Sequence, residues 1–193
     1  MIDKIQEAWA LASHYHAGQR YATPTEGVTL PYLTHLGAVT LEAQEAARRD
    51  PALDAELMTL CAILHDSLED TELAPEAIAE AFGARVLDGV RALTKDETLP
   101  TKQAQMADSL TRIIAQPREI AAVKLCDRIC NMGPPPAHWP AGKRAAYRAE
   151  AELILKELGH ASAYLADRLA RKITPFPSPD RPPSPPDPCG KAV

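Results

Sequence analysis

The sequence predicts an all-α fold, a compact bundle of several helices with almost no β-sheet. Apolar residues recur at intervals of three and four along most of the chain, which is the spacing of one face of a helix. The helix formers Ala, Leu and Glu are abundant, and the apolar-polar alternation typical of strands is nearly absent. Hydrophobic residues make up 46% of the 193 residues, which is enough for one sizeable core.

Glycines and prolines separate the expected helices. Gly18 follows the first helix and Gly83 divides the fourth from the fifth, while Pro75 and Pro117 suit the first turn of a helix. The run Pro134–Pro136 cannot continue a helix, because proline lacks the backbone N–H. We expect helices over residues 3–17, 31–48, 53–66, 75–82, 84–93, 101–115, 117–131 and 141–173, and a loop over residues 20–31.

The C-terminal end has a different composition. Eight of the fourteen residues from Pro175 to Pro188 are proline, and Ser, Asp and Arg stand between them. Such a segment cannot pack a core and is expected to be extended or disordered. We therefore divide the chain into a helical domain over residues 1–173 and a proline-rich tail over residues 174–193.

Composition excludes several classes of protein. The net charge is −5 and the basic residues are scattered, so no nucleic-acid partner is expected. No apolar run approaches the length of a membrane span, and the acidic N-terminus does not resemble a signal peptide. Four cysteines in such a chain indicate reduced thiols and a cytoplasmic location. The oligomeric state is left open.

One segment, residues 64–71, concentrates ionisable side chains directly after the apolar run 60–64. It contains His65, Asp66, Glu69 and Asp70. If the helix persists through it, residues four apart share a face, so His65 would lie above Glu69 and Asp66 above Asp70. Burying unpaired charge is unfavourable, and a divalent cation would offset it. The segment therefore predicts a metal site with carboxylates left over for proton transfer.

Two further polar residues stand in apolar surroundings. His35 lies early in the second expected helix, and Asp127 lies one helical turn before Asn131. Each alone is more typical of a packed histidine or a local ion pair. Together with His65 and Asp66 they form a set of two histidines and two aspartates from three helices. Such ligands suit Mn²⁺ or Fe²⁺ better than a structural zinc, which favours thiolates.

Other polar residues have plainer interpretations. Cys126 and Cys130 flank Asp127 at helical spacing and are expected to be packed thiols. His14 and His16 are expected at the surface or at the end of the first helix.

An ordered series of motifs resembles the hydrolase domain of RelA/SpoT-type alarmone enzymes, within the HD phosphohydrolase superfamily. The ordered set is more specific than the dipeptide His65-Asp66 alone. In its length of 193 residues and its lack of a synthetase region, the chain resembles a stand-alone small alarmone hydrolase, which implies an HD-domain bundle. The matching segments are His16-Ala-Gly-Gln19-Arg20, Pro31-Tyr32-x-x-His35, His65-Asp66-x-x-Glu69-Asp70-Thr71, Phe82-Gly83-x-x-Val86, Leu93-Thr94-Lys95 and Val123-Lys124-Leu125-x-Asp127-Arg128-x-x-Asn131-Met132.

The resemblance implies roles for these residues. It implies that Mn²⁺ is bound by His35, His65, Asp66 and Asp127, and that Glu69 and Asp70 handle the water and its protons. It implies nucleotide contacts from Arg20, Lys124, Asn131 and Tyr147. The implied reaction removes the 3′-pyrophosphate from guanosine tetra- or pentaphosphate, a small-molecule nucleotide, and leaves GDP or GTP.

Two segments depart from the family pattern. Residues 21–30 form a longer connection than usual and lack the basic residues expected directly after Arg20. The run Pro134–Pro136 after Asn131-Met132 is also unusual. Because residues 21–30 border the substrate site in the family, an adenosine analogue of the alarmone stays open as a better substrate.

Two other functions stay open from the sequence. The first is an HD phosphohydrolase that acts on another nucleotide, such as NADPH or a nucleoside monophosphate. The second is a non-catalytic module that binds alarmones or a partner, with the tail as one contact. The complete ligand set and the pair Glu69-Asp70 weigh against a pure binding module, which does not need them.

Overall fold

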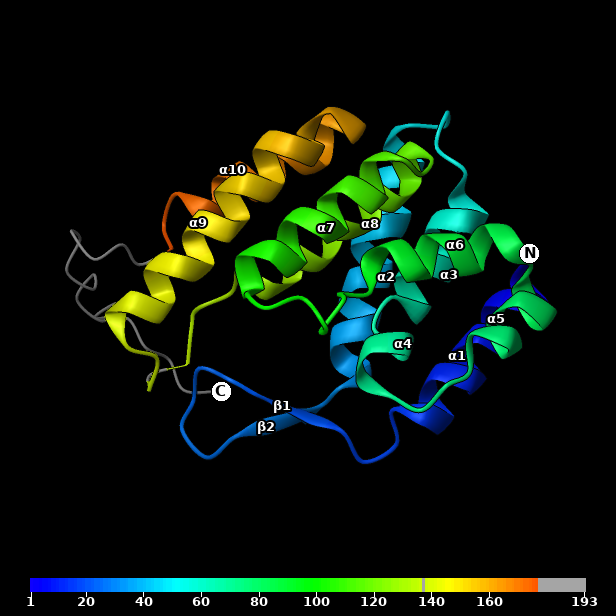
Figure 1. The fold of residues 1–193 in the computed structure, drawn as a ribbon, viewed down its shortest axis with the longest axis horizontal. Helices are drawn as coiled ribbons and strands as arrows, with labels where there is room; N and C mark the ends of the chain where they lie inside the picture. The colour runs from blue at the N-terminus through cyan, green and yellow to red at the C-terminus, as the bar shows by residue number, and fades with distance from the viewer. Residues whose placement is uncertain (137, 177–193) are drawn as a thin grey trace.

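The computed structural model describes residues 1–136 and 138–176, and its helical bundle confirms the predicted all-α class (Figure 1). The part of the tail beyond Phe176 lies outside the described residues. The helices are α1 (Ile2–Tyr15), α2 (Leu33–Arg49), α3 (Ala55–Leu64), α4 (Ser67–Asp70), α5 (Pro75–Phe82), α6 (Ala84–Leu93), α7 (Lys102–Ile114), α8 (Arg118–Asn131), α9 (Ala141–Leu158) and α10 (Ala163–Ile173).

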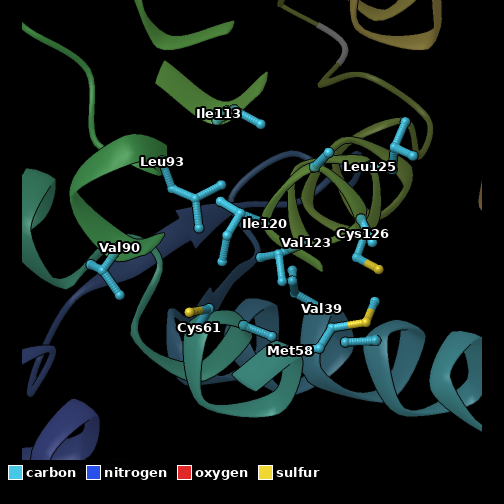
Figure 2. Packing of buried hydrophobic residues seen from close by; sticks show 14 of the residues in the cluster. Val39, Met58, Cys61, Val90, Leu93, Ile113, Ile120, Val123, Leu125 and Cys126 are labelled. Carbon is cyan, nitrogen blue, oxygen red and sulfur yellow. The ribbon is translucent and has the colours of Figure 1, made fainter. Parts of the chain in front are cut away.

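Helices α2, α3 and α8 form the centre of the bundle and pack against one another. Helix α3 is buried along its whole length after Glu56, and α8 is buried continuously from Glu119 to Ile129. Figure 2 shows side chains of these helices meeting those of α6, with Cys61 of α3 and Ile120 of α8 near Leu93 and Val90. Burial of so much apolar surface fixes the central helices, and therefore the polar residues they carry.

Helix α6 comes unusually close to this centre. A Cβ atom built on Gly89 would lie 2.5 Å from Cδ1 of Ile120 and 2.9 Å from Sγ of Cys61. Only a residue without a side chain lets the backbone of α6 approach α3 and α8 in this way.

The expected loop over residues 20–31 is instead a short antiparallel hairpin of β1 (Arg20–Ala22) and β2 (Thr29–Pro31). Tyr21 pairs with Leu30, and Gly27 takes a positive φ of 76° in the connection. Strands of three residues are too short to show the alternation of apolar and polar residues that predicts a strand. The prolines and the glycine of this segment therefore led to the prediction of a loop. The rest of the chain that the structure describes contains no further strand.

The expected helix over residues 53–66 does not continue into the acidic segment. Helix α3 ends at Leu64, and Asp66 has φ −101° and ψ 0° before α4 begins. The backbone N–H groups of Glu69 and Asp70 donate to the carbonyl of Asp66. The prediction of one continuous helix that places His65 above Glu69 is therefore wrong, since the chain breaks between α3 and α4, whereas Asp66 and Asp70 lie one helical turn apart as predicted.

The expected single helix over residues 141–173 is also two helices. A 3₁₀ turn at Gly159–Ala161 separates α9 from α10, and Ser162 Oγ accepts a hydrogen bond from the N–H of Leu165 at the start of α10. Figure 1 shows the two helices side by side, and both contact α8. The turn lets both apolar stripes reach the core, which one straight helix could not do.

Helix α1 packs against α3 and ends beside the acidic segment. His16 lies at the end of α1, as one of the two predicted alternatives has it, but it is buried and not at the surface. Its Nδ1 lies 2.7 Å from Oε1 of Gln19 and its ring stacks on Tyr32. Among the described residues, no helix is both long and apolar enough to cross a membrane.

Candidate active site

The bundle brings the predicted metal ligands together from three elements. His35 lies in the first turn of α2, His65 and Asp66 lie at the break between α3 and α4, and Asp127 lies on α8. One ligand atom each from His35, His65 and Asp127 lies within 4.8 Å of the others, and all three residues are buried. Asp66 adjoins them, with Oδ2 2.9 Å from Nε2 of His65 and 3.8 Å from Nε2 of His35.

The hydrogen bonding of His65 fits a metal ligand. In its neutral form the ring donates from Nδ1, which lies 2.9 Å from the carbonyl oxygen of Ala62, and keeps a lone pair on Nε2. This Nε2 is buried and lies 2.9 Å from Oδ2 of Asp66 without a well-aligned hydrogen bond. A cation between the two groups would use the lone pair and offset the charge of the carboxylate. The two imidazoles and the carboxylates suit a divalent transition metal.

Two side chains of α8, one charged and one neutral, hold Asp127 in place. Lys124 Nζ donates to Oδ2 of Asp127 over 3.1 Å, and the side-chain amide of Asn131 donates to Oδ1. The same Oδ1 lies 3.4 Å from Nε2 of His35. Lys124 and Asn131, which the family resemblance assigns to the nucleotide, therefore also orient a carboxylate of the metal site.

Asp66 is oriented by Tyr32, a residue to which the sequence analysis gave no role. The Tyr32 hydroxyl donates to Oδ2 of Asp66, and its ring lies 5.4 Å from that of His35. Tyr32 could have been found from its place in the motif Pro31-Tyr32-x-x-His35, one turn before a ligand. Its partner is 34 residues away, and no local pattern shows such a contact.

Glu69 is held at two points by Lys95. Its Oε2 accepts the backbone N–H of Lys95 over 3.0 Å, and its Oε1 accepts the ammonium over 2.7 Å. Lys95 follows the end of α6, so the loop after this helix fixes the orientation of the carboxylate. The sequence analysis quoted Leu93-Thr94-Lys95 as a motif without assigning a function to the lysine.

The charges of the cluster shift several pKa values in opposite directions. Burial alone would lower the pKa of His65, but the carboxylates of Asp66 and Asp127 outweigh it and raise this pKa to about 9. Burial would raise the pKa of Asp127, yet Lys124 and the two histidines hold it well below its usual range.

Asp70 differs from the other carboxylates. Burial, followed by the negative charges of Asp66 and Glu69, raises its pKa above the ordinary value. A carboxyl group that holds its proton to higher pH beside ionised carboxylates suits a proton donor.

The structure has a cavity of about 570 Å³ at this site, which we call the charged cavity. Its wall contains four carboxylates and three other predicted site residues, namely Asp66, Glu69, Asp70, Asp127, Lys124, Asn131 and Tyr147. Residues that the sequence analysis did not assign to the site also line it, namely Tyr32, Lys95, Lys102, Arg128, Trp139 and Lys143. Cations and carboxylates therefore share one concave surface, and the cations suit the oxygens of a phosphorylated ligand.

Tyr147 and Arg20 differ in their placement. Tyr147 packs over the guanidinium of Arg128 at 4.5 Å, and burial raises the pKa of its hydroxyl to about 12. Arg20 does not line the charged cavity. Its guanidinium donates across the hairpin to the hydroxyl and the carbonyl oxygen of Thr29, so its nucleotide contact stays a prediction.

Two kinds of known protein are similar to this chain, one much longer than the chain and one of similar length. A GTP pyrophosphokinase of Streptomyces coelicolor is 32% identical over 134 residues, which cover 68% of this chain but only 14% of that protein. The zebrafish (Danio rerio) protein named guanosine-3′,5′-bis(diphosphate) 3′-pyrophosphohydrolase MESH1 is 28% identical over 172 residues, or 86% of this chain and 89% of that protein. The chain thus spans a small part of the first relative and most of the second.

A solved structure shares the fold. It is described as a metazoan ortholog of SpoT that hydrolyses ppGpp, and it superposes with a TM-score of 0.73 at 25% identity, covering 88% of this chain and 93% of its own. The HD domain family matches residues 8–163, which include every predicted metal ligand and both catalytic candidates. The chain therefore belongs to the HD domain family.

Proposed function

We propose that this protein is a metal-dependent hydrolase that removes the 3′-pyrophosphate from guanosine 3′,5′-bis(diphosphate)-type alarmones. One observation carries the proposal: Asp127, which clusters with His35 and His65, lines the charged cavity together with a Glu69 carboxylate fixed by Lys95. The similarity to named 3′-pyrophosphohydrolases over most of the chain supports this substrate class.

In this proposal His35, His65, Asp66 and Asp127 hold a divalent cation, with Mn²⁺ as our choice. Imidazole and carboxylate together suit Mn²⁺ and Fe²⁺, and the ligand atoms lie close enough to share one ion. When bound, such an ion supplies Lewis acidity toward a phosphoryl oxygen and lowers the pKa of a nearby water.

The other residues divide the proton transfers. Water attacks the phosphorus attached to the ribose 3′-oxygen, and Glu69 accepts the proton that the water loses. The bond between this phosphorus and the 3′-oxygen breaks, and the leaving oxygen takes a proton from Asp70, whose pKa is raised. Lys95 and Lys124 face the cavity and oppose the negative charge of the pyrophosphate. Pyrophosphate and a nucleoside 5′-diphosphate leave.

The experiment is a turnover assay with Mn²⁺ on guanosine 3′,5′-bis(diphosphate), with products separated by ion exchange. We expect pyrophosphate and GDP in equal amounts. Glu69→Gln is expected to lower kcat by about 10²- to 10⁴-fold, because general base catalysis is lost. Glu97→Gln is the matched control, since Glu97 lines the same cavity and is exposed.

NADPH is assayed in parallel as a competing substrate. Phosphate release from NADPH without turnover of the alarmone would replace our proposal with a different HD phosphohydrolase. Metal binding without turnover of either compound would also contradict it. The same assays with His35→Ala, which should lose both metal and activity, separate the role of the metal from that of Glu69.

A further inference from the structure

A second cavity adjoins the charged cavity and has the opposite character. It has a volume of about 380 Å³ and shares Asn131, Trp139 and Tyr147 with the charged cavity. Its other walls are the hairpin at Tyr21 and Leu30, the run Pro134–Pro136, and Phe176. We call it the apolar slot. The three shared residues place the two cavities side by side.

Of the residues that the structure describes, those lining the slot include no charged side chain. Two of its polar side chains are engaged elsewhere. The hydroxyl of Thr23 donates to the carbonyl of Val28 over 3.0 Å, and the amide N–H of Asn131 donates to Asp127. The three prolines present ring carbons and carbonyl oxygens but no N–H donor.

This division matches the two ends of a nucleotide. Phosphates need cations and the metal ligands, whereas a purine base is flat, mostly apolar and suited to aromatic and proline rings. Resting on the proposed function, we propose that the base of the alarmone enters the apolar slot, and that the slot does not distinguish guanine from adenine.

The hydrogen-bonding side chains of the slot do not select one purine. A site selects one purine by pairing fixed donors and acceptors with O6, or N6, and N1 of the ring. Tyrosine hydroxyls of Tyr21 and Tyr147 can donate or accept, so they fit either base. The indole N–H of Trp139 can pair with a ring nitrogen that both purines carry. A single neutral hydrogen bond would change the preference by at most about tenfold.

The first test compares kcat/KM for guanosine 3′,5′-bis(diphosphate) and its adenosine analogue under the same metal concentration. We expect the two values to agree within about tenfold. A larger preference for either purine overturns the inference and leaves the hydrolase proposal intact. Failure to hydrolyse both overturns the hydrolase proposal itself, so the two failures are distinguishable.

The second test fills the slot from the hairpin. Ala22→Trp and Leu30→Trp change residues that line the slot but not the charged cavity, and both are exposed, so the fold should tolerate them. We expect KM for both nucleotides to rise about tenfold or more, with kcat nearly unchanged. Inhibition by pyrophosphate, which has no base, should stay the same.

Leu41→Trp is the matched control, since Leu41 is 68% exposed on α2 and lies in neither cavity. It should leave every constant unchanged. If both slot variants keep the normal KM for both nucleotides, the base does not enter the slot and the inference is wrong. If they also weaken pyrophosphate inhibition, the substitutions disturb the metal site and the inference again loses its support.

Discussion

Tyr32 joins three parts of the site through one side chain. It precedes α2, its ring stacks on the buried His16, and its hydroxyl donates to Asp66. Burial, followed by the charge of Asp66, holds the pKa of this hydroxyl far above its usual range, so it remains a donor. Its place in the site is therefore to orient a ligand carboxylate.

We expect Tyr32→Phe to weaken the binding of Mn²⁺ by about 10- to 100-fold, as loss of a partner that orients a metal ligand generally does. Calorimetric titration of the metal-free protein measures this directly. Tyr164→Phe, on α10, is the control and should bind normally. An unchanged Kd in Tyr32→Phe would mean that Asp66 needs no such support.

Lys95 is expected to act on catalysis through Glu69. Lys95→Met removes the ammonium but keeps the backbone N–H that Glu69 also accepts. We expect kcat to fall about 10- to 100-fold, within the range that general base catalysis supplies. Lys95→Arg should restore part of the loss. Lys102→Met, which changes a lysine of the same cavity, should mainly raise KM, and an equal effect on kcat would refute the difference between the two lysines.

Some site residues could be predicted from sequence and others could not. His35, His65 and Asp127 converge as predicted, because each is a polar residue at a position that the apolar pattern buries. Tyr32 and Lys95 act through partners 34 and 26 residues away, which no local spacing shows. The catalytic and nucleotide-binding roles of the predicted residues remain predictions.

At the scale of elements, the long helices were predictable and the breaks were not. Helices such as α7 and α8 carry clear apolar faces and marked starts, with Thr101 accepting a hydrogen bond from the N–H of Ala104 and Pro117 preceding Arg118. The break at Asp66 has no glycine or proline near it. The turn at Gly159–Ala161 packs against α8, and its local signals are only Gly159 and the cap residue Ser162. The hairpin is too short to produce a strand pattern.

The contact between α3 and α8 predicts how two thiols react. Cys61 and Cys126 are fully buried, and burial raises the pKa of Cys61 to about 12 and that of Cys126 well above its usual range. Because only the thiolate reacts with iodoacetamide, neither should be labelled in the native protein at pH 8. Raising the pH to 9 should increase the labelling of these two cysteines very little, since the pKa of both thiols is raised.

Peptide mass spectrometry after a short exposure measures the labelling. The same protein in guanidinium chloride is the control, and both cysteines should then react fully. Rapid labelling of either in the native state would mean that α3 and α8 separate readily.

At the scale of the whole molecule, the proposed metal site links helices that are distant in sequence. A cation that binds only the folded chain stabilises it by about 2.7 kcal/mol at a free concentration of 100 times its Kd. We expect Mn²⁺ to raise Tm, and His35→Ala or Asp127→Asn to remove the increase. His14→Ala, an exposed histidine of α1, should keep it. An equal rise in all variants would place the stabilising ion elsewhere.

The order of the proposed ligands along the chain has a consequence for synthesis. His35, His65 and Asp66 are made well before Asp127, and α8 must pack against α2 and α3 to bring Asp127 to the other three. A ribosome-bound chain that ends before α8 carries three ligands but lacks the helix that brings the fourth. Metal loading should therefore follow release of α8 from the ribosome, and nascent chains truncated before it should not retain the ion.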